Sequence, residues 1–132
     1  MQNYSVITAA FAERHYIKSF RKDYKHAWEI TFKDVIKFAA GRIDVVLQTK
    51  KADLIIEKES YKVVKFDFAV DGTKMSPKTS GCRCIFVVNE EERSVEIVLV
   101  YKKTDIDMRG GETSSWKRMV RENYPEYREL CA

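Results

Sequence analysis

Long apolar runs are missing from this chain of 132 residues. A membrane-spanning helix needs roughly 18 or more consecutive apolar residues, and no stretch of that length occurs. The N-terminal segment also lacks a charged region followed by an apolar core, so it does not resemble a secretory signal. Internal repeats and low-complexity tracts are absent as well. These absences predict a cytoplasmic protein that has no membrane partner.

Cysteine is scarce, and its spacing does not match a zinc site. The chain has three cysteines, with Cys82 and Cys84 two positions apart and Cys131 near the C-terminus. None of these spacings is typical of zinc ligands. We interpret the cysteines as reduced thiols, because nothing near them supports a redox or metal role. We expect neither a metal nor a cofactor.

The composition is typical of a well-charged globular protein. Hydrophobic residues make up 45% of the chain and charged residues 33%. A chain of this length can bury a real core, so we expect one domain over residues 1–132. The net charge is +4, from 24 basic and 20 acidic residues. This small excess permits a polyanionic partner without requiring one, so a basic site has to be found locally.

The segment from Ser80 to Asp107 predicts a β-hairpin. Residues 83–88 and 95–101 consist almost entirely of β-forming types, and the charged turn Asn89–Ser94 separates them. We expect the rest of the chain to be organised around this hairpin.

The turn length sets which side chains share a face of the hairpin. An even-numbered loop pairs Val88 with Val95, and therefore Arg83 with Val100. Because side chains alternate between faces, one face is apolar. This face would carry Cys84, Phe86, Val88, Val95, Ile97, Leu99 and Tyr101. The other face would bring Arg83 close to Lys102. These two cations form a candidate site, or they are merely solvated strand ends.

The remaining patterns predict an α+β fold. The expected strands are an edge strand Tyr4–Ala9, a strand Leu54–Glu57 and a strand Tyr61–Val70, and a loop Asp71–Gly81 follows the last of them. The expected helices are one over 12–27, one from a Thr31/Asp34 cap to about Gln48, and a final one capped by Thr113 or Ser114. We therefore expect an antiparallel sheet of about four strands. Two N-terminal helices would pack on one face, followed by a C-terminal helix.

A third cation is expected beside the first two. The strand Tyr61–Val70 alternates, with its apolar side formed by Val64, Phe66, Phe68 and Val70. If this side packs against the helices, Lys65 shares the other face with Arg83 and Lys102. The following loop adds Lys74 and Lys78, which suit a phosphate backbone as well as they suit solvent. Three cations from three strands are harder to attribute to chance than one.

Two segments resemble the RelE/ParE superfamily of bacterial toxins. They are Gly81–Phe86, which enters one strand, and Val100–Ile106, which leaves the next. The order of elements resembles that family over most of the chain. The resemblance implies a RelE-like fold and a small toxin of a toxin–antitoxin system, held by a cognate antitoxin. It also implies a metal-independent endoribonuclease that cleaves mRNA on the ribosome by 2′-hydroxyl attack.

The resemblance also implies roles for single residues. Arg83 matches the family's strand arginine and would clamp the phosphate. Lys65 matches basic positions on the preceding strand and would serve as a base. Lys102 stands where many members carry a histidine or another polar catalytic group. The lysines expected to contact RNA are Lys62, Lys74, Lys78 and Lys103.

The chain departs from the family pattern in two ways. No histidine follows Tyr101, so acid–base catalysis by histidine is excluded at that position. Tyr101 itself falls on the apolar face of the expected hairpin and receives no role. The loop 71–81 is also longer than the family's usual turn. A gyrase-directed toxin, a non-enzymatic RNA- or protein-binding module, and an α+β domain with solvated cations remain alternatives.

Overall fold

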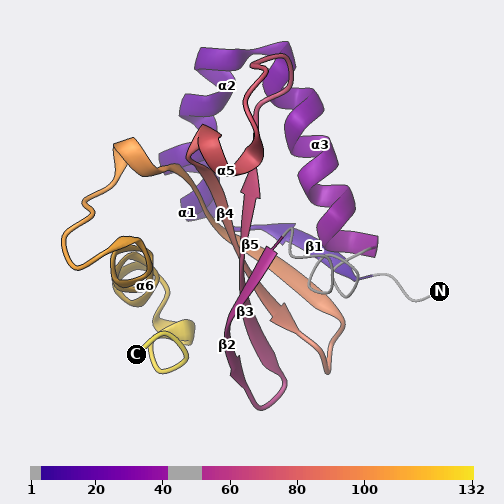
Figure 1. Cartoon of the computed structure of the whole chain (residues 1–132). Helices are drawn as coiled ribbons and strands as arrows, with labels where there is room; N and C mark the ends of the chain where they lie inside the picture. The colour runs from indigo at the N-terminus through magenta and orange to yellow at the C-terminus, as the bar shows by residue number, and fades with distance from the viewer. Residues whose placement is uncertain (1–3, 42–51) are drawn as a thin grey trace.

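Five strands form one sheet in the computed structural model, which describes residues 4–41 and 52–132 (Figure 1). The strands are β1 (Ser5–Thr8), β2 (Ala52–Lys58), β3 (Tyr61–Phe68), β4 (Cys82–Asn89) and β5 (Ser94–Lys102). Their order across the sheet is β1-β5-β4-β3-β2. All neighbouring strands are antiparallel except β1 and β5, which run parallel. The expected α+β class is therefore correct, whereas the sheet has one strand more and is mixed.

The helices divide into an N-terminal group and a C-terminal group. The N-terminal group consists of α1 (Ala10–Ala12), the π-helical segment η1 (Glu13–Ile17), α2 (Lys18–Tyr24) and α3 (His26–Gly41). Later in the chain come α5 (Pro77–Ser80), η2 (Lys103–Asp105), α6 (Glu112–Asn123) and η3 (Pro125–Tyr127). In the described part of the chain, no helix has the length and apolarity that crossing a bilayer requires.

The first two expected helices are present, with different boundaries. The helix expected over 12–27 corresponds to the continuous run α1–η1–α2, which ends at Tyr24 because Lys25 adopts a positive φ of 51°. The expected start of the next helix at Thr31 is wrong, since α3 begins at His26. Thr31 lies inside α3, where its hydroxyl donates to the carbonyl of Ala27 and accepts from the amide of Asp71. The expected extension toward Gln48 lies outside the described residues.

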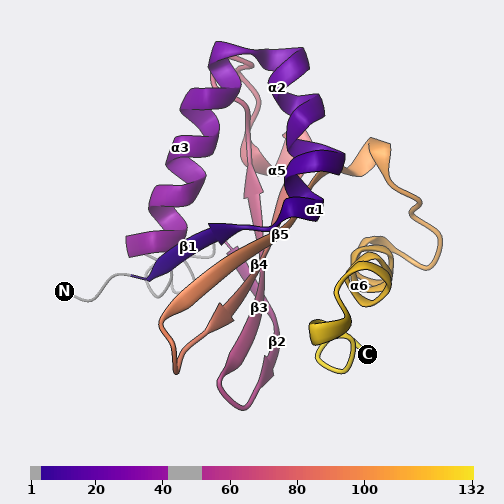
Figure 2. The same ribbon diagram turned by 180° about the vertical axis from the view of Figure 1, so that it is seen from behind.

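Helices cover both faces of the sheet. α1, α2 and α3 lie against one face, and α6 lies against the other, as the two opposite views show (Figure 2). The face under α1–α3 carries Val64, Phe66, Phe68, Cys84, Phe86, Val88, Val95 and Ile97. The face under α6 carries Val63, Ile85, Val87, Val98, Leu99 and Tyr101. All three cysteines are free and buried.

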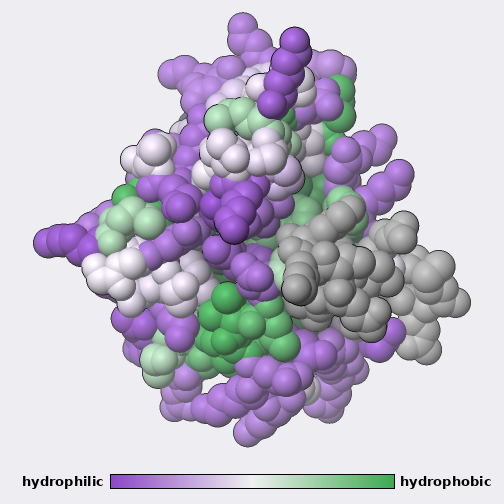
Figure 3. All heavy atoms as spheres, in the orientation of Figure 1, coloured by the Kyte–Doolittle hydropathy of each residue, from purple (hydrophilic) through white to green (hydrophobic). Residues whose placement is uncertain are grey.

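The edge strand β2 is partly exposed. Figure 3 shows a green apolar patch at the position of β2 and β3, surrounded by hydrophilic atoms, and Leu54 of β2 is 43% exposed. The expected strand Leu54–Glu57 is confirmed and extends to Ala52 and Lys58. The C-terminal helix is confirmed as well, but Gly111 precedes it and the predicted caps Thr113 and Ser114 lie within it.

A β-bulge in the β4–β5 hairpin changes its expected register. Val88 pairs with Val95 as predicted, but the register shifts between Phe86 and Ile85. Val98 is the extra residue, because Phe86 pairs with Ile97 and Ile85 pairs with Leu99. The prediction that Arg83 pairs with Val100 is therefore wrong.

The shifted register exchanges the side chains at the end of β5 between the two faces. Arg83 pairs with Tyr101, and Cys82 pairs with Lys102. Because side chains alternate along a strand, Tyr101 lies on the α6 face with Arg83, whereas Lys102 lies on the α1–α3 face with Cys82.

Replacing Trp116 with alanine is expected to destabilise the protein by about 3–5 kcal/mol, the usual cost of removing a buried tryptophan. The Trp116 side chain is 0% exposed and packs in the core between α6 and the sheet. Urea unfolding measures the change, with Glu122→Ala on the exposed side of α6 as the control. An equal loss of stability in both variants would show that the Trp116 ring does not hold α6 against the sheet.

Candidate functional site

Charged and polar side chains from five elements meet on the α6 face, at the end of the sheet where β5 leaves it. The residues, which we call the Arg83 cluster, are Lys65, Asp67, Arg83, Tyr101, Lys103 and Glu112. Strand pairing aligns part of the cluster, since Asp67 pairs with Arg83 and Arg83 pairs with Tyr101. α6 contributes Glu112 from its first turn, and η2 contributes Lys103. With three cations and two carboxylates, the cluster has a formal charge of +1.

Arg83 is buried and held by the protein backbone. Its side chain is 3% exposed. Nη1 donates to the carbonyls of Pro77 and Cys82 at 3.2 and 3.1 Å, and Nη2 donates to the carbonyl of Lys78 at 3.2 Å. Nε lies 3.1 Å from Oδ1 of Asp67 as an ion pair, without the alignment of a hydrogen bond. Arg83 therefore ties α5 to the sheet, and its outer nitrogens are occupied by carbonyls instead of facing open space.

The carboxylate of Glu112 lies among three cations and a phenol. The Tyr101 hydroxyl donates to Oε2 at 2.7 Å. Nζ of Lys65 lies 3.9 Å from Oε2, and Nε of Arg83 lies 3.4 Å from it. Nζ of Lys103 lies 3.7 Å from Oε1. These cations suit an anion whose oxygens point in several directions, which describes a phosphate as well as a carboxylate.

Burial changes the protonation behaviour of two groups in the cluster. Burial raises the pKa of Asp67, and the charges of Arg83 and Lys65 oppose this increase. Burial also raises the pKa of Tyr101, and its hydrogen bond to Glu112 raises it further. Tyr101 therefore stays protonated and acts as a donor. Asp67 is a carboxylate whose proton affinity is higher than usual, which suits a group that accepts and returns a proton.

The predicted convergence of Lys65, Arg83 and Lys102 is wrong for Lys102. Lys65 and Arg83 share the α6 face and the same two carboxylates. The bulge places Lys102 on the opposite face, where its ammonium donates to the Tyr24 hydroxyl. It also lies 4.6 Å from the centre of the Tyr24 ring. A regular hairpin register was assumed in the prediction, and one extra residue moved Lys102 away.

The lysines expected to contact RNA occupy different places. Lys103 belongs to the Arg83 cluster. Lys62 lies on the α1–α3 face. Its Nζ lies 3.1 Å from Oε1 of Glu90 and 3.8 Å from Oε2 of Glu57. Lys74 and Lys78 are exposed on the connection between β3 and β4. Contact of these side chains with RNA stays a prediction.

Three members of the cluster were not predicted. Asp67 follows Lys65 by two positions on a predicted strand, so the alternation alone could have placed it on the same face. Tyr101 was assigned to the apolar face because the bulge was not foreseen. Glu112 comes from a separate element, and its contact with the sheet depends on how α6 packs.

No protein-family model matches this chain, and no curated protein matches it. Among solved structures, the fold is similar to a chain of the archaeal RelE–RelB complex from Pyrococcus horikoshii. The match is 12% identical, covers 77% of this chain and 97% of the matched chain, and has a TM-score of 0.48. A similarity of this extent does not establish a family or a function, so the function has to be inferred from the residues of the site.

Proposed function

We propose that this protein is a RelE-like toxin of a toxin–antitoxin system. In this proposal it is a cytoplasmic, metal-independent endoribonuclease that cleaves mRNA on the ribosome and is restrained by a cognate antitoxin. The observation that carries the proposal is the anion site formed around Glu112 by Lys65, Arg83 and Lys103. Two of these cations, Arg83 and Lys103, belong to the two segments whose sequence resembles the RelE/ParE superfamily.

The cluster contains the groups that cleavage by 2′-hydroxyl attack requires. Such a reaction needs a base for the 2′-hydroxyl, cations for the phosphate oxygens and an acid for the leaving oxygen. Asp67 accepts the proton of the 2′-hydroxyl as the 2′-oxygen attacks phosphorus. Lys65, for which the resemblance implied the role of base, is instead the acid: it gives a proton to the departing 5′-oxygen, which leaves a 2′,3′-cyclic phosphate and a 5′-hydroxyl. Lys103 stabilises the charge on the phosphate oxygens.

Arg83 acts in this proposal mainly as a positioning residue. Its Nη atoms bind the carbonyls of Pro77, Cys82 and Lys78, so they are not free for the bidentate phosphate contact expected from the sequence. Its Nε faces Asp67 and Glu112 and fixes both carboxylates.

Neutralising Glu112 is expected to strengthen RNA binding. An RNA phosphate would take the place of the Glu112 carboxylate, and two anions at one site repel each other. The Glu112→Gln variant removes one negative charge and keeps the shape of the side chain. We expect its dissociation constant for a single-stranded RNA to fall by about threefold to tenfold, equivalent to roughly 1 kcal/mol. Fluorescence anisotropy at fixed salt measures the change, and weaker binding would contradict the assignment of the phosphate to this place.

Single-lysine variants test whether Lys65 and Lys103 contact phosphate. Each neutralised contact should reduce the slope of log K against log salt by about 0.7 for a single strand. We expect this reduction in Lys65→Gln and in Lys103→Gln. Lys37→Gln, on the exposed side of α3, is the matched control and should keep the slope of the wild type. Equal slopes in all three variants would exclude the Arg83 cluster as the RNA site.

The appearance of new RNA ends tests whether the protein cleaves RNA. The purified protein is added to an mRNA in a translation extract and to the same mRNA without ribosomes, and new 5′ ends are mapped. The proposal expects new 5′-hydroxyl ends that are absent when Lys65 is replaced. If cleavage requires the ribosome, these ends appear only in the translation extract. Growth arrest after induction in bacteria, with recovery when a partner antitoxin is present, tests the toxin assignment.

A non-enzymatic module is the second candidate function. The observation that favours it is the neutralisation of Arg83 and Lys65 by Asp67 and Glu112, which leaves little free positive charge in the cluster. A gyrase-directed toxin or an RNA-binding module on the same scaffold would arrest growth or bind RNA without producing new RNA ends.

A further inference from the structure

A hollow lined by both apolar and polar residues lies beside the Arg83 cluster, between the N-terminal helical run and the end of β5. Its volume is about 210 Å³. It is lined by His15, Tyr16, Ser19, Phe20, Asp23, Tyr101, Lys102 and Asp105. Pockets for drug-sized ligands usually measure about 300–1,000 Å³. The hollow, which we call the Lys102 pocket, is therefore of a size that suits one small flat group.

Two irregular pieces of backbone build this pocket. The π-helical segment η1 carries His15 and Tyr16, and segments of this kind are frequent at functional sites. The bulge at Val98 brings Lys102 to the side of α2, next to Tyr101, which borders the pocket from the strand. The pocket is thus produced by two departures from regular structure that meet at one place.

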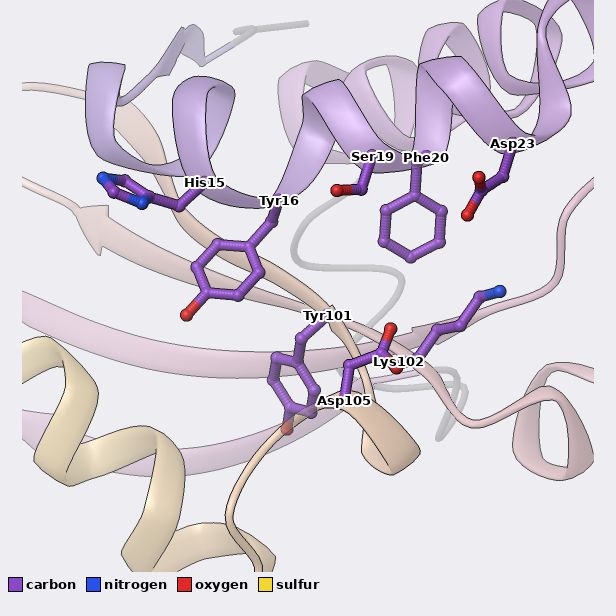
Figure 4. A pocket seen from close by; sticks show the side chains of 8 residues that line it. All are labelled: His15, Tyr16, Ser19, Phe20, Asp23, Tyr101, Lys102 and Asp105. Atoms are coloured by element: carbon purple, nitrogen blue, oxygen red, sulfur yellow. The ribbon is translucent and has the colours of Figure 1, made fainter.

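Aromatic rings and charged side chains both line the pocket. Figure 4 shows the rings of Tyr16 and Phe20 pointing from the helical run toward β5. Asp105 points up between them, and Lys102 extends toward Asp23. Within the described ranges 4–41 and 52–132, the side-chain carboxylates of Asp23 and Asp105 take part in no hydrogen bond and no ion pair, although the charge of Asp105 helps to raise the pKa of Lys102. Both carboxylates can therefore accept hydrogen bonds from a ligand.

Lys102 is a fixed cation in this pocket. Its ammonium donates to the Tyr24 hydroxyl, and its Nζ lies 5.7 Å from the centre of the Phe20 ring. The hydrogen bond to Tyr24 raises the pKa of Lys102, although burial opposes the increase. An ammonium has three donors, so two remain for an acceptor in the pocket.

We propose that the Lys102 pocket binds a guanine base of single-stranded RNA. Bases of single strands are recognised by stacking on aromatic side chains and by hydrogen bonds to their edges. Guanine alone among the four bases offers two adjacent donors, N1–H and N2–H, to one carboxylate. On its other side O6 and N7 are acceptors, which suit a lysine. Asp105 or Asp23 therefore reads the donors, and Lys102 reads the acceptors.

Tyr101 connects this pocket to the Arg83 cluster. The residue borders the pocket, whereas its ring points away from the N-terminal helical run toward the α6 face, where its hydroxyl donates to Glu112. A strand of RNA could therefore place a base in the pocket and a phosphate in the cluster. This inference rests on the proposed function, because it assigns the pocket to the same RNA.

Titration of the full chain with single nucleotides tests the pocket directly. The chain is titrated with GMP, AMP, CMP and UMP, and binding is followed by NMR shifts or calorimetry. A bidentate base contact discriminates by about 5- to 100-fold, so GMP should bind more tightly than the others by a factor in this range. Asp105→Asn and Asp23→Asn are each compared with the wild type, and at least one of them should reduce the preference to less than about twofold.

Glu91→Gln is the matched control, because this exposed carboxylate in the turn between β4 and β5 lies outside the pocket. It should keep the full preference for GMP. Equal binding of the four nucleotides, or no binding of any, would overturn the proposal. The same is true if both aspartate variants keep the preference of the wild type.

The two proposals fail in different ways. If the wild type cleaves RNA without preference for guanine and Asp105→Asn and Asp23→Asn leave the cleavage pattern unchanged, the pocket proposal is wrong and the proposed function stands. If GMP binds selectively and single-stranded RNA is bound with a preference for guanine but is never cleaved, the pocket proposal stands and the proposed endoribonuclease is wrong.

Discussion

Replacing Asp67 with asparagine lowers the rate of RNA cleavage by about 10²- to 10⁴-fold, the usual contribution of a positioned acid or base. The carboxylate is the proposed acceptor for the 2′-hydroxyl proton, and an amide of the same shape cannot accept a proton. Burial raises the pKa of Asp67, which brings its proton affinity closer to what a base needs. Single-turnover cleavage of a labelled RNA measures the loss. Asp34→Asn, at an exposed aspartate on α3, is the control.

The same substitution has an effect on stability that does not depend on the reaction. A folded-state pKa above the ordinary 3.8 means that the folded protein holds this proton more tightly than the unfolded chain does. The contribution to stability is complete at low pH and is lost as the pH rises through the folded-state pKa. The free energy of unfolding of the wild type should therefore fall, relative to that of Asp67→Asn, as the pH rises through the folded-state pKa of Asp67. A constant difference in the free energy of unfolding from about pH 3 to pH 7 would contradict the raised pKa.

Replacing Arg83 with methionine destabilises the fold by about 3–5 kcal/mol, because breaking a buried ion pair leaves its partners uncompensated. Three backbone carbonyls would each lose one donor, and Asp67 and Glu112 would lose their nearest cation. Urea unfolding measures the change. Arg83→Lys should recover only part of the loss, since an ammonium cannot reproduce the fork of a guanidinium.

Arg14→Met is the control for this variant, because Arg14 is exposed on the N-terminal helical run. A surface substitution of this kind usually changes stability by no more than about 0.5 kcal/mol. If Arg83→Met unfolds at the same urea concentration as the control, the guanidinium does not hold α5 to the sheet. Its proposed role as a positioning residue would then be lost.

Alternation along single strands predicted much of the sheet. Val64, Phe66 and Phe68 lie in the core under α1–α3, as the period-2 pattern of their strand indicated. Lys65 and Arg83 share the opposite face for the same reason. These predictions are correct because each depends only on which side of a strand a residue lies, and local sequence decides that.

Features that depend on more than one element could not be predicted. Val98 is a β-forming residue like its neighbours, so nothing in the sequence marks it as the extra residue of a bulge. Thr31 has the side chain of a helix cap, but in the fold it serves to hold the amide of Asp71. Glu112 reaches Arg83 only because α6 packs on the sheet.

The extra residue at Val98 also makes the Arg83 cluster and the Lys102 pocket depend on the length of the same strand. Tyr101 and Lys102 are neighbours in the chain, yet one serves the Arg83 cluster and the other the Lys102 pocket. Deletion of the Val98 codon would move the Tyr101 side chain to the α1–α3 face and the Lys102 side chain to the α6 face. Both sites would be damaged at once. Length changes in this strand should therefore be far rarer among descendants of this gene than substitutions, and the two sites should be gained or lost together.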